Sequence, residues 1–254
     1  MSRGGTASWY GVDGVRYLDV LDLCSPDEFR RRTMKERKQR TLRAFDRHLV
    51  RQARERIGRR AALLHPAMMY ALFEPFWTLQ TSLRWVQDFT RAQRIVPPAI
   101  EGLRLPQPYV AVRFYFSKCF RETPGNHERV RSLIRRLAAE TNVVVLGSGV
   151  ALDEHREIGP ANAGPHDDGR HDRVHTVEHL MRPETNLAVQ TAVIAGAQAF
   201  IGTYGGFSYL APLCGVNSVA LYSQRNYYPH HLDFARHVFQ AVGGGSLSVI
   251  GVSA

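Results

Sequence analysis

The segment from Ala199 to Gly215 (AFIGTYGGFSYLAPLCG) constrains the fold of this chain more than any other. It opens with an apolar run typical of the end of a buried strand, passes through Gly205 and Gly206, and closes in a short helical pattern. Glycine lets a backbone turn tightly and approach a ligand closely. Ser208 is predicted to cap the helix N-terminus and Gly215 to end the helix. The segment therefore predicts a strand, a tight turn and a helix in succession.

A turn of this kind exposes backbone N–H groups at the positive end of a helix, where a phosphate binds favourably. The glycines lack the GxGxxG spacing of dinucleotide-binding folds, and no Lys-Ser or Lys-Thr pair follows them as in a P-loop. A tight turn without any ligand is the alternative interpretation. The pattern favours a nucleotide or a nucleotide-linked substrate.

Strands and helices alternate regularly after Pro108. The predicted strands are Tyr109–Arg113, Val143–Leu146, Arg173–Val177, Ala199–Gly202 and Ser218–Tyr222. The predicted helices are Asn126–Thr141, Glu184–Ala197, a short one after Ser208, and His230–Ala241, with a polar loop over 147–172. Such alternation predicts an α/β fold, a Rossmann-like parallel sheet with helices on both faces.

The N-terminal part has a different composition. Residues 30–60 contain 14 basic and three acidic side chains, whereas the rest of the chain is close to neutral. They predict a long helix with an apolar stripe, followed by an apolar helix over 68–91. Residues 95–108 are rich in proline and predict a linker. We therefore expect a mainly helical domain over 1–105 and a Rossmann-like domain over 106–254.

The basic helix has three interpretations. It can be a solvated arginine face over an apolar stripe, or a site for anionic lipid or a phosphate-bearing acceptor. Nucleic-acid binding is disfavoured because aromatic residues do not interleave with the arginines. The three cysteines are far apart and the N-terminus has no apolar signal region, so a reducing cytoplasm is the expected compartment.

Arg113 ends the first strand of the regular domain. Ligands of open α/β sheets bind beyond the carboxyl ends of the strands, and the turn that begins at Thr203 leaves the same edge. An arginine and a helix N-terminus at one place suit a diphosphate. An ion pair between Arg113 and a nearby carboxylate is the alternative.

The stretch from Tyr109 to Gln240 resembles the C-terminal, donor-binding domain of a GT-B glycosyltransferase, with a layout similar to bacterial and fucosyltransferase-like members. The likeness lies in YVAVRFY, in VVVLGSG with LDEH, and in AFIGTYGGFSYLAPLCGVNSVALYS. It implies metal-independent sugar transfer from a nucleotide-sugar donor, with no cofactor. It also implies that the donor phosphates contact Arg113, Thr203, Tyr204, Gly205, Gly206, Phe207 and Ser208, and the nucleoside Asp153, Glu154 and His155.

The same resemblance implies a preceding acceptor-side domain, and residues 1–105 are too few for a complete one. His65 is a candidate base for the acceptor hydroxyl, with a buried or capping histidine as the alternative. The motifs depart from the fucosyltransferase and heptosyltransferase patterns, so the sugar, the base and the acceptor stay open. A lipid- or membrane-associated acceptor would place the protein peripherally at the inner membrane.

Two other function classes are considered. A non-catalytic module could bind an anionic polymer or a membrane through Arg30–Arg60. A nicotinamide-dependent enzyme is disfavoured because no GxGxxG follows the first strand. The five histidines between His155 and His179 lie among aspartates, but no HExxH or paired cysteines accompany them, which disfavours a metal site.

Overall fold

The computed structural model describes residues 44–57, 80, 82, 84, 93–147, 156–158, 170–182, 185–224 and 229–252. These residues fall into two compact units, one that contains 44–57 and one that contains 93–182 and 186–252. The domain boundary predicted at 105 stays a prediction. Most of the predicted N-terminal elements, including the apolar helix over 68–91, lie outside the described residues.

The first unit contains helix α2 (Ala44–Ile57), which lies within the predicted basic helix. Leu49 and Ala53 of this helix are buried, and Phe45 is half-buried. Its four arginines, at 47, 51, 54 and 56, are exposed. The helix therefore has the predicted apolar stripe and a solvated arginine face.

The second unit is a Rossmann-like α/β domain. Its six-stranded sheet has the order β5-β3-β1-β6-β7-β8, and every pair of neighbours is parallel. The strands are β1 (Tyr109–Arg113), β3 (Asn142–Val145), β5 (Val174–Thr176), β6 (Ala199–Thr203), β7 (Asn217–Tyr222) and β8 (Leu247–Gly251). The five predicted strands are confirmed, and β8 is an additional edge strand that the sequence analysis missed.

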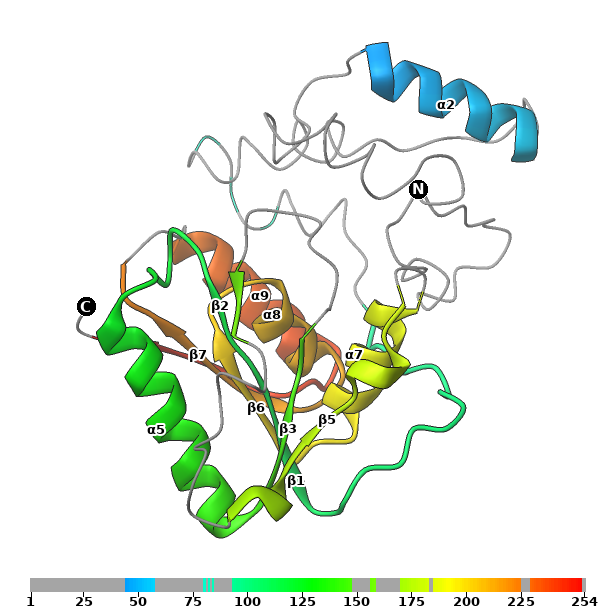
Figure 1. Ribbon diagram of the computed structural model, residues 1–254. Coiled ribbons are helices and arrows are strands. Elements are labelled where there is room, and N and C mark those ends of the chain that lie inside the picture. The colour runs from blue at the N-terminus through cyan, green and yellow to red at the C-terminus, as the bar shows by residue number, and fades with distance from the viewer. Residues whose placement is uncertain are drawn as a thin grey trace. The chain divides into compact units, whose positions relative to one another are not determined.

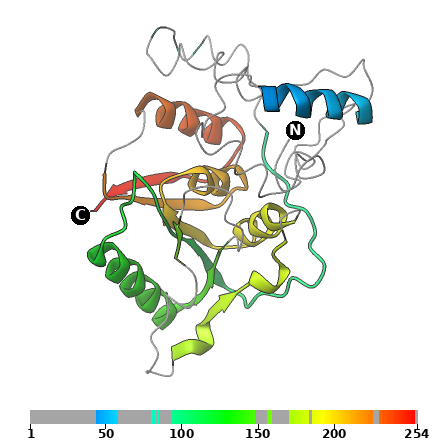
Figure 2. The same cartoon turned by 45° about the horizontal axis from the view of Figure 1, so that its top comes forward.

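Helices cover both faces of this sheet (Figures 1 and 2). One face carries α5 (Pro124–Glu140), and the other carries α7 (Asn186–Ala195), α8 (Gly206–Leu213) and α9 (Pro229–Ala241). The start of α5 is set by Thr123, whose hydroxyl accepts a hydrogen bond from the amide of Asn126, and by Pro124 in the first turn. The predicted α/β fold is therefore confirmed.

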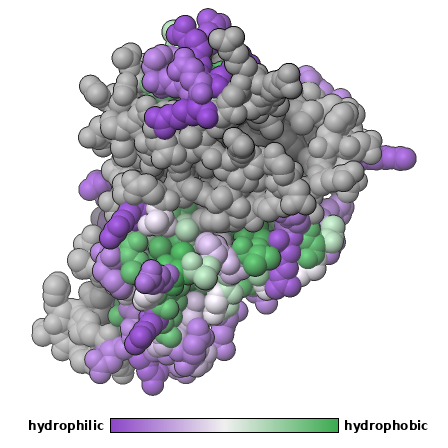
Figure 3. Space-filling model, turned by 90° about the vertical axis from the view of Figure 1, so that its right-hand side faces the viewer, coloured by the Kyte–Doolittle hydropathy of each residue, from purple (hydrophilic) through white to green (hydrophobic). Residues whose placement is uncertain are grey.

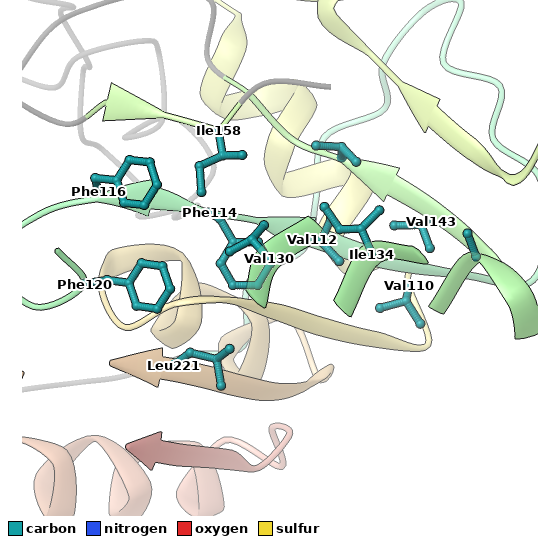
Figure 4. Close-up of a cluster of buried hydrophobic side chains, with 12 residues drawn as sticks. Val110, Val112, Phe114, Phe116, Phe120, Val130, Ile134, Val143, Ile158 and Leu221 are labelled. Atoms are coloured by element: carbon teal, nitrogen blue, oxygen red, sulfur yellow. The ribbon is translucent and has the colours of Figure 1, made fainter. Parts of the chain in front are cut away.

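Successive side chains of β1 point to opposite faces of the sheet, so the strand contributes to a hydrophobic core on each face. Val110 and Val112 point toward α5, where they pack with Val130 and Ile134 (Figure 4). Tyr109 and Ala111 belong to the cluster that α7 and α8 cover. A strand buried on both faces reads as a continuous apolar run, which is why YVAV was recognisable in the sequence.

The predicted loop over 147–172 contains local structure. Strand β4 (Arg156–Glu157) pairs with β2 (Tyr115–Phe116) in a small antiparallel sheet, and two short 3-10 helices, η3 (Arg170–Arg173) and η4 (Glu178–Leu180), flank β5. The prediction of a polar loop was wrong for β4 and for most of η3, whereas β2 and η4 lie outside the predicted loop. Two-residue strands carry no periodicity by which a sequence could reveal them.

Residues 95–108, predicted as a linker, pack on the sheet unit. Ile95 is buried, and its amide donates to the carbonyl of Leu213. Ile100, Leu103 and Leu105 pack against the core cluster beneath α7 and α8. Figure 3 shows the side of the molecule that lies to the right in Figure 1, where hydrophobic patches alternate with hydrophilic side chains. The apolar positions of this proline-rich segment extend the core.

Candidate functional site

The strand order places a topological switch point between β1 and β6. The chain runs from β1 to β3 and β5 on one side, and from β6 to β7 and β8 on the other. Connections leave the two central strands in opposite directions, and in open α/β sheets ligands bind outside the carboxyl ends of the strands at such a point. Arg113 pairs with Gly202 across these strands, one residue before Thr203 ends β6. The two segments predicted to form one site therefore do end at the same place.

Arg113 is a buried cation at this switch point, only 9% exposed. Its Nη2 donates to Oε1 of Glu157 at 2.5 Å, and its guanidinium carbon lies 3.8 Å from the ring centroid of Phe207. Its Nε and Nη1 are buried and have no hydrogen-bond partner among the described residues. Buried donors in native proteins are normally bonded, so these two call for an acceptor.

The first turn of α8 lies against this arginine. Gly205 is the N-cap residue, and the prediction of Ser208 as N-cap was wrong by three positions. Ser208 instead reaches back: its Oγ accepts from the amide of Gly205 at 3.2 Å and donates to the carbonyl of Gly205 at 2.7 Å. By helix geometry the amides of Gly206 and Phe207 have no acceptor within the helix, and they carry its positive dipole end.

The two glycines of the turn have different surroundings. A Cβ on Gly205 would lie 1.8 Å from the phenol oxygen of Tyr115, so only glycine fits there. A Cβ on Gly206 would meet nothing within 4 Å. Gly205 is therefore required by the packing of Tyr115, whereas Gly206 borders open space.

Thr203 and Tyr204 bond to other parts of the protein. The Thr203 hydroxyl accepts from the amide of Tyr115 at 3.1 Å and donates to its carbonyl at 3.0 Å. The Tyr204 amide donates to the carbonyl of Leu221, and its hydroxyl bonds that of Tyr209. These contacts tie the segment after β1 to the end of β6, and Phe207 is the turn residue that contacts Arg113.

Several predicted site residues cannot be placed. His65, Asp153, Glu154 and His155 lie outside the described residues. His175 lies on β5 with its Nε2 3.3 Å from Oδ1 of Asn142. No three His, Cys, Asp or Glu side chains of the described residues come together as metal ligands.

Tyr115 and Glu157 are site residues that the sequence analysis missed. Tyr115 follows the predicted strand directly, but its contact with Gly205 depends on the register between β1 and β6. Glu157 comes from the long segment between β3 and β5, where nothing in the sequence singles it out from its neighbours. The alternative interpretation, an ion pair of Arg113 with a carboxylate, is present, and two further nitrogens of the same guanidinium have no partner among the residues that the structure describes.

The C-terminal end of α8 is capped by groups of the protein itself. Gly215, with φ +89°, ends the helix as predicted, and the amide of Cys214 bonds the carbonyls of Leu210 and Ala211. Nη2 of Arg94 donates to the carbonyl of Cys214 at 3.4 Å. Burial raises the pKa of the Cys214 thiol to about 11, although Arg94 acts in the opposite direction. The thiol is therefore neutral and unreactive near pH 7.

No protein-family model and no curated protein matches the chain. Among solved structures it is similar to the crystal structure of the glycosyltransferase SnogD from Streptomyces nogalater, at 18% identity and a TM-score of 0.30. That match covers 63% of this chain and 38% of the other. No helix among the described residues is long and apolar enough to cross a bilayer.

Proposed function

We propose that this protein is a glycosyltransferase that moves a sugar from a nucleotide-sugar donor to an acceptor, without a metal ion or other cofactor. The observation that carries the proposal is a pair of nitrogens on buried Arg113 that have no hydrogen-bond partner in the described part of the chain, beside the first turn of α8 at the β1/β6 switch point. A diphosphate would supply the acceptors that both groups require. The GT-B resemblance of the sequence assigns the same residues to the donor phosphates.

The chemistry follows from where charge develops. As the bond between the sugar and the diphosphate breaks, negative charge grows on the leaving oxygen. The Arg113 guanidinium and the amides of Gly206 and Phe207 are fixed before the reaction, so they stabilise that charge without reorganisation. Glu157 and the ring of Phe207 hold the guanidinium in place from two sides.

The acceptor side of the reaction is part of the same proposal. His65 is our candidate base for the acceptor hydroxyl. The exposed arginines of α2 suit an acceptor at an anionic membrane surface, which would make the protein a cytoplasmic one that binds the membrane peripherally.

Calorimetry with nucleoside diphosphates tests the donor site. UDP, GDP, ADP and CDP are titrated into the full chain, with NAD as the comparison ligand. Arg113→Ala is expected to weaken binding by about tenfold or more, because a charge-assisted contact is lost. Arg94→Ala is the matched control, and its affinity should equal that of the wild type. Unchanged affinity in Arg113→Ala would show that the diphosphate binds elsewhere.

A second candidate is a binding module for an anionic polymer or membrane. The observation that favours it is the solvated arginine face of α2 over the buried Leu49 and Ala53. Replacing Arg47, Arg51 and Arg54 by Gln should then abolish binding to anionic vesicles, whereas Arg113→Ala should not alter it. If the protein is instead a glycosyltransferase, Arg113→Ala should weaken the binding of the nucleotide donor, and the replacement of the three α2 arginines should leave donor binding unchanged.

A further inference from the structure

A groove runs along α5 on the face of the sheet that this helix covers. Its volume is about 510 Å³, and residues of α5 and of β7 line it. Leu133 and Leu221 supply apolar surface in it, whereas Glu128, Ser132 and Arg136 supply polar and charged groups. Of the described helices of the sheet unit, α5 alone lies on this face, although the sheet is six strands wide (Figure 1). One helix leaves part of this face uncovered.

The uncovered part of the face is apolar. Leu221 belongs to the buried cluster beneath α5 (Figure 4). It pairs with Ile250 of β8 in parallel register, so the two side chains lie on the same side of the sheet. Ile250 is 47% exposed, and Val219 and Val252, which pack against the same cluster, are only half-buried. Apolar surface exposed beside an edge strand is typical of a surface that another chain covers.

Charged side chains along the groove are arranged symmetrically. Glu128, Ser132 and Arg136 are spaced by four residues, so they form one ridge along α5. Ser132 is midway, and the other two each lie about 6 Å from it along the helix axis. If two such ridges run antiparallel about Ser132, each Glu128 meets the Arg136 of the other copy. The ridge is therefore complementary to itself, as a two-fold interface requires.

Both charges of the ridge can make such contacts. Arg136 is exposed, and it has no ion-pair partner among the described residues. Oε1 of Glu128 accepts from Nη2 of Arg135 at 2.5 Å, but both side chains are exposed, so this ion pair adds little stability in water. The second oxygen of Glu128, Oε2, can accept from another guanidinium.

We propose that this groove binds a second copy of the chain, with the two α5 helices antiparallel about a two-fold axis at Ser132. Two contacts between Glu128 and Arg136 form across the axis, and the small side chain of Ser132 lets the helices approach closely. The partner helix covers Leu133 and Leu221, which stabilises the dimer by removing apolar surface from water. This proposal does not depend on the proposed function, because none of these residues belongs to the donor site.

Other partners fit the ridge less well. A basic segment would be attracted by Glu128 and repelled by Arg136, and the reverse holds for an acidic segment. Arg129, which also lines the groove, already donates to Oδ1 of Asn126 at 2.7 Å. A second copy is the partner that necessarily carries both charges at the required spacing.

Sedimentation velocity on the full chain, over a wide range of concentration, tests this proposal. We expect a dimer, and we expect Glu128→Arg or Arg136→Glu to raise its dissociation constant by about tenfold or more, because each places two like-charged pairs across the axis. An equimolar mixture of the two variants should recover the dimer, because every pair across the axis then joins a basic and an acidic side chain. Glu101→Arg and Arg104→Glu are the matched controls, since they reverse exposed charges in the segment that packs on the opposite face, and both should dimerise as the wild type does.

Three outcomes would overturn the proposal. A chain that stays monomeric at every concentration shows that the groove does not bind a second copy. A dimer that both charge reversals leave intact uses a different surface. Loss of the dimer in each variant, without recovery in their mixture, shows that the ridge does not meet its own copy. Nucleoside diphosphate affinity is measured on the same samples and should be equal in all of them, so a failure of the proposed function is seen separately.

Discussion

The two ends of α8 use the same residue types for opposite purposes. At the C-terminal end, Arg94 bonds the carbonyl of Cys214 beside Gly215. At the N-terminal end, Arg113 stacks on Phe207 beside Gly205. The first arginine offers a donor to a helix carbonyl, whereas the second leaves two buried nitrogens without a partner in the described chain. The C-terminal end is capped by groups of the protein, whereas the described residues supply no acceptor for the two buried nitrogens at the N-terminal end.

The helix dipole explains why this difference matters. A cation at a helix C-terminus is stabilised by the partial negative charge there, by about 0.3–1 kcal/mol. A cation at the N-terminus lies against partial positive charge, and folding alone gives no reason to bury one there. Glu157 offsets part of this cost, but a single carboxylate does not occupy all the donors. The N-terminal arginine is therefore better explained by an anionic ligand than by stability.

The largest expected effect comes from the two glycines of the N-terminal turn. Gly205→Ala should lower the free energy of unfolding by about 3 kcal/mol, because its Cβ would overlap the phenol oxygen of buried Tyr115, whose backbone is held by two hydrogen bonds with the Thr203 hydroxyl. Gly206→Ala, the matched variant, should raise it by about 0.5 kcal/mol, because alanine favours a helix and meets open space. Chemical denaturation measures both. Equal midpoints for the two variants would contradict the difference in their surroundings.

The sheet and its switch point could be predicted from the sequence. Strands such as Tyr109–Arg113 are buried on both faces and are apolar throughout, and the alternation with helices implied parallel pairing. Arg113 and the glycine turn could be assigned to one edge because parallel strands share their carboxyl ends. β8 (LSVIG) was missed because its short run contains serine and glycine and looks like a tail.

The surroundings of Arg113 could not be predicted. Glu157 reaches it through the pairing of two-residue strands, and Tyr115 reaches Gly205 through the β1/β6 register. Neither contact leaves a periodic signal in the sequence. The capping of α8 was misplaced for a related reason: serine favours both the N-cap and the N3 position that bonds back to it, and only the backbone shows which of the two it takes.

Buried Cys214, at the C-terminal end of α8, should make the free energy of unfolding decrease at alkaline pH. The Cys214 thiol ionises near pH 9 when unfolded and near pH 11 when folded, so the unfolded chain binds fewer protons between these values. Stability is then complete below pH 9 and falls by roughly 2 kcal/mol as the pH rises to 11. Denaturation curves of the wild type and Cys214→Ala from pH 7 to 11 measure this. Tyr109 acts in the same direction only above pH 10, so the interval from 9 to 10 isolates the thiol.

Gly215→Ala tests the backbone at the C-terminal end of α8. Alanine at φ +89° should cost about 1.5 kcal/mol, because a Cβ is unfavourable in the left-handed region. The new Cβ would also lie 2.1 Å from Nη2 of Arg94, an exposed side chain that can move away. The same substitution in an Arg94→Ala background should therefore keep most of its cost. Complete rescue in that background would show that the arginine, and not the backbone, requires glycine.

The smallest effect is the most direct comparison of the two arginines. Arg94→Ala should lower the free energy of unfolding by about 0.5 kcal/mol, less at high salt, because it removes a screened cation at the negative end of the helix. Arg113→Ala loses the ion pair with Glu157 and the stack on Phe207, but it also removes two buried donors that have no partner in the described residues and the repulsion at the positive end of the helix, so we expect these terms to offset one another and the net change to stay within about 0.5 kcal/mol. Denaturation at low and high salt measures both variants beside their diphosphate affinities. If Arg113→Ala proved the more destabilising and kept its affinity, Arg113 would be a structural residue like Arg94, and the two ends of α8 would serve the same purpose.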